Sequence, residues 1–112
     1  MPNPKEFCEA MRELVVLSQR NPATAVSAEA YEMKLRILDF FTERDPTPDV
    51  MDSLLRERIA DPDPMKELSR GICGQILNSW QAGSWHYSPD GRLLLRALYP
   101  AETPSGIEED EP

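Results

Sequence analysis

The segment from Ser27 to Arg44 constrains the fold more than any other part of the chain, because an α-helix formed by it is apolar over more than half of its circumference. An ordinary surface helix has an apolar stripe of only about 100°. We therefore expect this helix to stand at the centre of the fold, covered by other helices on two or three sides. Its charges recur every three or four positions and form one narrow stripe, which consists of Glu29, Glu32, Arg36, Asp39 and Glu43.

Three further helix starts share one device, in which a capping side chain stands directly before a proline. The capping side chain accepts a hydrogen bond from a free backbone N–H, and proline at the first helical position loses no bond that a helix would make. The three pairs are Asn3-Pro4, Thr47-Pro48 and Asp63-Pro64. They predict helices over residues 4–19, 48–60 and 64–81, the last of which stops near Gly83.

The segment after Gly83 changes in character and predicts a β-hairpin over about residues 84–99. Pro89-Asp90-Gly91 stands between an aromatic run and an aliphatic run. Proline sets the first corner of such a turn, and glycine takes the positive φ that closes it. An alternative is a short helix over residues 92–99, which the helix propensities of leucine, arginine and alanine favour.

The charge of the chain is concentrated at its end. The 112 residues have a net charge of −8, but five of the 20 acids lie in the last eleven residues, where there is no Lys or Arg. Residues 1–100 then hold 15 acids against 12 bases. We expect a single, mainly α domain over residues 1–100, with four helices and the C-terminal hairpin (an α+β variant), followed by a disordered acidic tail over 101–112.

Cysteine usage and hydropathy bear on the compartment. Cys8 and Cys73 both fall on apolar faces of predicted helices. Two buried thiols, no export signal and no apolar run of about 20 residues favour a cytoplasmic protein without a membrane span.

The sequence contains no pattern that indicates catalysis, a metal site or a cofactor. His86 is the only histidine, and no nucleophile or orienting carboxylate is placed beside it by any motif. Cys8, Cys73 and His86 lack the paired spacing of zinc ligands. We therefore expect a protein that is not an enzyme and that has no catalytic, metal-binding or cofactor-binding residues and no small-molecule substrate.

An aromatic and basic group of residues at the hairpin is the predicted contact surface. Trp, Tyr and Arg are the residues that dominate the energetics of protein interfaces. The group consists of Trp85, Tyr87, Arg92, Arg96 and Tyr99. The corresponding function is a small regulatory, adaptor or inhibitor-type domain that binds a protein partner or a second copy of itself, as a homodimer. The alternative for Trp85 and Tyr87 is that they close the end of the core.

Two helices joined by a proline turn and followed by a hairpin resemble the order of elements in winged-helix DNA-binding domains. This resemblance implies a second function, nucleic-acid binding, with residues 64–82 as the recognition helix. A recognition helix needs Lys and Arg for phosphates and bases, and this one offers only Lys66 and Arg70, beside Glu67. We therefore rank a nucleic-acid partner below a protein partner.

Overall fold

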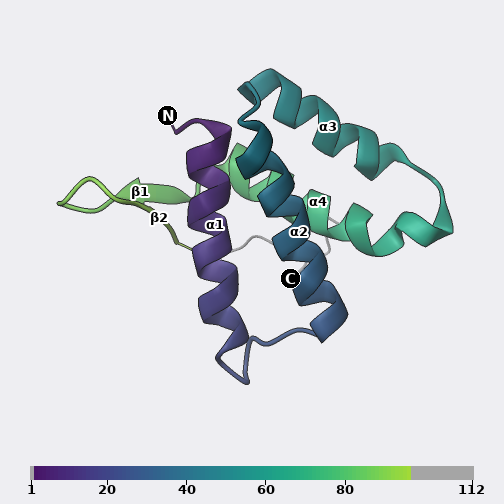
Figure 1. Cartoon of the computed structure of the whole chain (residues 1–112), viewed down its shortest axis with the longest axis horizontal. Coiled ribbons are helices and arrows are strands. Elements are labelled where there is room, and N and C mark those ends of the chain that lie inside the picture. The colour runs from purple at the N-terminus through teal and green to yellow at the C-terminus, as the bar shows by residue number, and fades with distance from the viewer. Residues whose placement is uncertain (1, 97–112) are drawn as a thin grey trace, which may run out of the picture.

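The computed structural model describes residues 2–96, which form four α-helices and one β-hairpin (Figure 1). A 3₁₀ turn precedes the last helix. The elements in chain order are α1 (Pro4–Gln19), α2 (Ala28–Arg44), α3 (Pro48–Ala60), η1 (Pro64–Lys66), α4 (Glu67–Ala82), β1 (Trp85–Tyr87) and β2 (Leu93–Leu95). The prediction of a mainly α fold with a C-terminal hairpin is confirmed. Tyr99 and the acidic segment 101–112 lie outside the described residues.

The predicted capping residues all begin helical segments. The side chains of Asn3, Ser27 and Thr47 accept hydrogen bonds from backbone N–H groups three residues further on. Asp63 caps η1 instead of α4, because the chain makes one 3₁₀ turn before the α-helix begins. Gly83 ends α4 in the left-handed conformation, with φ of 64°, as the sequence predicts.

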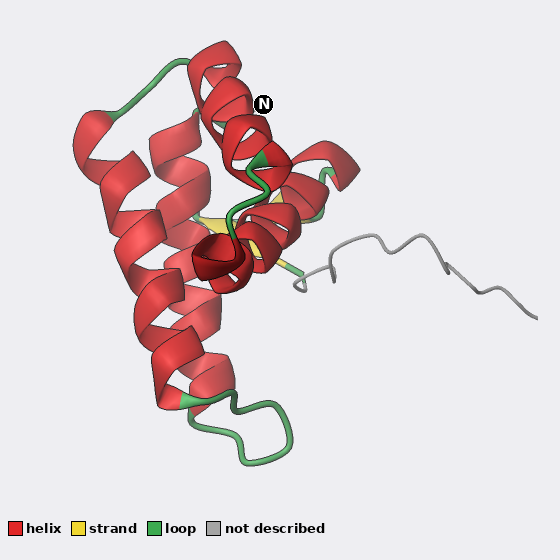
Figure 2. Cartoon of the chain, turned by 90° about the vertical axis from the view of Figure 1, so that its right-hand side faces the viewer, coloured by secondary structure: helices red, strands yellow, loops and turns green. Residues whose placement is uncertain are grey.

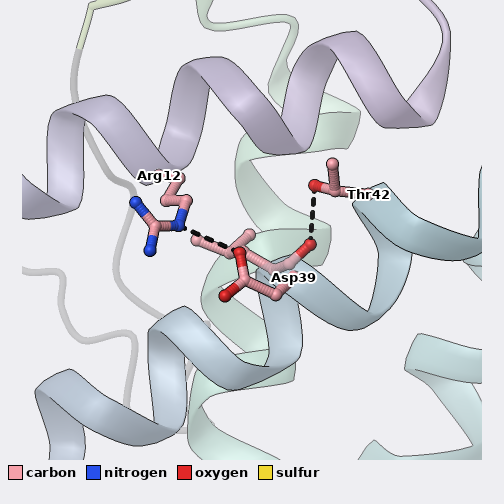
Figure 3. Close-up of polar contacts among 4 residues, drawn as sticks. Arg12, Asp39 and Thr42 are labelled. Atoms are coloured by element: carbon pink, nitrogen blue, oxygen red, sulfur yellow. Dashed lines mark hydrogen bonds and ion pairs between the residues drawn. The ribbon is translucent and has the colours of Figure 1, made fainter.

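Helices α1 and α2 lie side by side and antiparallel, and α4 crosses behind them in Figure 1. An ion pair joins the two helices, in which Arg12 Nε lies 2.9 Å from Asp39 Oδ1 (Figure 3). Both side chains are about half exposed, so this pair fixes orientation more than it stabilises the fold. In the next turn of α2, Thr42 donates a hydrogen bond to the backbone carbonyl of Leu38.

One hydrophobic core unites residues from all four helices, and α1 and α4 supply most of it. The completely buried side chains include Phe7, Cys8, Met51 and Leu55. From α4, Ile72, Cys73, Ile76, Leu77 and Trp80 are buried. Within residues 2–96, no helix is long and apolar enough to cross a membrane.

The prediction that the 27–44 helix is the covered centre of the fold is wrong. Only Leu38 and Phe41 of α2 are buried, whereas Met33 and Ile37 are half-buried and Phe40 is 38% exposed. The physical reason is that α2 packs mainly against α1 and α4 among the helices. Helix α3 packs against α4 instead and diverges from α2, on the side of α2 that faces away from α1 (Figures 1 and 2). Helix α4 therefore takes the more covered position.

The hairpin forms with the predicted turn, and residues 93–95 are a strand rather than a helix. Its strands pair antiparallel, with Trp85 opposite Leu95 and Tyr87 opposite Leu93. In the turn, the N–H of Gly91 donates to the carbonyl of Ser88, and Gly91 has φ of 84°. The hairpin tip extends away from the helices on the side of α1 (Figure 1).

Candidate interaction surfaces

Trp85, the first residue of the predicted contact surface, lies against the core. Its ring makes an edge contact with Phe7, with 5.5 Å between ring centroids, and lies equally close to Trp80. Phe7 and Trp80 also meet edge to face, at 5.0 Å. Three aromatic rings from α1, α4 and β1 therefore fasten the hairpin to the helices.

The other described residues of the predicted contact surface each have a different interaction partner. Tyr87 is 49% exposed, and its hydroxyl lies 3.4 Å from a carboxylate oxygen of Glu6. Arg92 forms an exposed ion pair of 2.6 Å with Glu13. Arg96 is exposed and donates a long hydrogen bond to the carbonyl of Trp85. The structure thus brings Tyr87 and Arg92 to the carboxylates of α1, whereas Arg96 stands apart and Tyr99 lies outside the described residues.

A groove with apolar lining lies between α2, α3 and α4. The sequence did not predict it. It encloses about 410 Å³. We call it the α2–α3 groove. Met33, Ile37 and Phe40 of α2 form one wall, and Leu54 of α3 forms the other. It exists because α2 and α3 diverge after the turn at residues 45–47, so the wide apolar face of α2 is not covered by α3.

Charged side chains border the α2–α3 groove and are held by local contacts. The guanidinium of Arg44 lies 4.0 Å from the centroid of the Phe40 ring, within the range of a cation–π contact. Arg58 donates to the hydroxyl of Ser69 at 3.0 Å. Arg36 and Glu57 complete this border. The lining therefore combines apolar side chains with charges of both signs, including Arg36, Glu57 and Asp61.

The thiols have raised pKa values. Burial raises the pKa of Cys8 to about 12, and the charge of Glu9 adds to this effect. Burial also raises the pKa of Cys73, although the nearby positive charge of Arg58 opposes the shift. A nucleophilic cysteine requires a thiolate, so these environments do not activate either residue. Both cysteines are free.

The described part of the chain has no cluster of metal-ligating side chains. His86 is exposed on the hairpin. Across residues 2–96 there is no group of three or more His, Cys, Asp and Glu side chains that could hold a metal ion.

Helix α4, the main part of the predicted recognition helix, contains one basic residue, Arg70, which is half-buried. Arg70 donates to the backbone carbonyls of Asp61 and Asp63, which brace the turn before α4. The exposed residues of α4 carry no positive charge; they are Glu67, Gly71, Gln81 and Ala82. The order of elements resembles that of a winged helix, but the exposed residues of α4 include no Lys or Arg for contact with phosphates.

Sequence reasoning missed the groove, although it recognised the wide apolar face of the 27–44 helix that forms one of its walls. The available signal was the width of the apolar face of the 27–44 helix, which is too great for contact with two neighbouring helices. A second signal was Lys34, a charge near the middle of that helix that lies off the charged stripe. The chain matches no known protein-family model, no curated protein sequence and no solved structure.

Proposed function

We propose that this chain is a non-enzymatic protein-binding module, a small regulatory or adaptor-type domain, that binds its partner in the α2–α3 groove. The observation that carries the proposal is a groove of about 410 Å³ with an apolar floor and a mixed charged border. An apolar groove is a common receptor for the apolar face of an amphipathic helix. A partner helix is therefore the occupant that we favour, supplied by another protein or by a second copy of the chain.

The compartment that we propose for this protein is the cytoplasm. Two free, buried thiols support a reducing compartment. The hairpin residues Tyr87, Arg92 and Arg96 remain candidate partner contacts on a separate face. Nucleic-acid binding stays the less favoured alternative, because Arg70 is engaged by backbone carbonyl groups and the exposed residues of α4 carry no positive charge.

Charge substitution inside the groove tests the proposal. We expect Ile37→Glu to weaken partner binding at least about tenfold, because a carboxylate on the apolar wall of the groove loses its hydration when a partner docks. The matched control is Met65→Glu, since Met65 is 88% exposed and does not line the groove. Partner recovery on immobilised full-length chain, from an extract of the source cells, is quantified for wild type and both variants.

The expected result is loss of the same captured protein from Ile37→Glu and its retention by Met65→Glu. Sedimentation velocity of the three proteins tests the second-copy form of the proposal in the same way. If Ile37→Glu has the wild-type circular dichroism spectrum and retains every partner and any self-association, the groove is not the binding surface. If it unfolds, Met33→Glu at the half-buried edge of the groove replaces it.

A further inference from the structure

A second groove, distinct from the α2–α3 groove, surrounds Lys34 on the side of α1 and α4. Two adjoining hollows of about 340 and 520 Å³ share Val26 and Lys34 as lining residues. The first is lined by Leu14 and Val15 of α1 and reaches Arg96. The second continues towards Leu68 of α4. We call the two hollows together the Lys34 groove.

Lys34 is half-buried in this groove and has no carboxylate partner in the described part of the chain. No hydrogen bond or ion pair joins it to another residue within 2–96. Burial lowers the pKa of Lys34, because a positive charge is less stable where water is excluded. Arg96, at the mouth of the same hollow, also lacks a carboxylate partner within residues 2–96. Two cations thus line the groove without an ion pair to any carboxylate of residues 2–96.

The acidic end of the chain has the complementary chemistry and begins at the groove. Residues 97–112 carry five acids and no Lys or Arg. They follow directly on Arg96, which itself lines the groove. Leu98 and Tyr99 are two and three residues further on, and Glu102 is the first acid. Six extended residues span up to about 20 Å, so Glu102 is within reach of Lys34.

We propose that the acidic segment 97–112 binds the Lys34 groove of its own chain, with Leu98 and Tyr99 on the apolar wall and Glu102 beside Lys34. Direct linkage gives this segment a high effective concentration at the groove, in the millimolar range for short linkers. A free acidic peptide would need substantial affinity to compete with it. Glu67 lines the far end of the groove and repels further acids there, so the carboxylates gather at Lys34 and Arg96.

Methyl NMR spectra of the full chain test this proposal without disturbing the described fold. One variant neutralises the segment through Glu102→Gln, Glu108→Gln, Glu109→Gln, Asp110→Asn and Glu111→Gln. A second variant carries Leu98→Ser with Tyr99→Ser. The control is Asp49→Asn, which removes an exposed acid of α3. We expect both segment variants to shift the methyl signals of Val26 and Leu68 and to leave those of Val50 unchanged, while the control shifts neither Val26 nor Leu68.

Titration of Lys34 by NMR gives the second readout. The pKa of Lys34 should fall further when the five acids are neutralised, because an adjacent carboxylate favours the charged amine. In a Lys34→Met background, the same neutralisation should change the Val26 and Leu68 signals much less.

Three results would overturn the proposal. Unchanged Val26 and Leu68 signals in both segment variants would show that the groove is not occupied by this segment. A dependence of these signals on protein concentration would assign the groove to a second copy. An undiminished effect of neutralisation in Lys34→Met would remove Lys34 as the partner of the acids.

Discussion

Gly71 lies on the exposed side of α4, where a side chain would meet nothing. A Cβ atom built at Gly71 has no neighbour within 4 Å, and the residue has ordinary helical backbone geometry. Glycine in a helix interior costs about 1 kcal/mol relative to alanine. We expect Gly71→Ala to raise the free energy of unfolding by about 0.5–1 kcal/mol, measured by urea denaturation. Gly83→Ala is the contrasting variant and should destabilise, because Gly83 has positive φ.

Residue-level inference from the sequence succeeded where the controlling interactions are local. Asn3, Ser27 and Thr47 cap their helices because each bond spans only three residues. Met65 is a residue for which this local inference failed. It lies in the predicted helix 64–81, but the chain places it in the 3₁₀ turn before α4, where it is 88% exposed.

At the scale of elements, attachment of the hairpin depends on Trp85. Its ring packs between the hairpin and the aromatic residues Phe7 and Trp80. Because Trp85 is half-buried, Trp85→Ala should cost about 2–3 kcal/mol, below the range for completely buried tryptophan. The control Tyr87→Ala should cost less than about 1 kcal/mol, since Tyr87 makes one long hydrogen bond at the surface. Equal losses in urea denaturation would contradict this role of Trp85.

Most of the helices and the hairpin could be predicted from the sequence. Proline-containing turns and capping residues mark the ends of α1, α2 and α3, and Pro89-Asp90-Gly91 marks the hairpin. Propensity alone favoured a helix after residue 92, but strand pairing and the buried position of Leu93 against α1 override it. Which side chains of the hairpin face the helices and which face solvent could not be predicted from the sequence. Their direction depends on how the hairpin packs against the helices.

For the whole molecule, the placement of α2 was the feature that the sequence could not supply. A helical wheel shows which side chains are apolar, but not whether a neighbouring helix or an open groove lies beside them. The divergence of α2 and α3 depends on how Met51 and Leu55 of α3 pack into the core. These contacts join residues that are distant in the sequence, so local sequence patterns do not predict them.

The accessibility of the α2–α3 groove in solution tests the central claim most directly. Methyl relaxation caused by a neutral paramagnetic cosolute is measured on the full chain at low concentration. We predict strong enhancement for Met33, Ile37 and Leu54, and weak enhancement for the buried Leu38 and Leu55. Uniformly weak enhancement at all five residues would contradict the account, because it would mean that α2 is covered and that no groove is open to a partner.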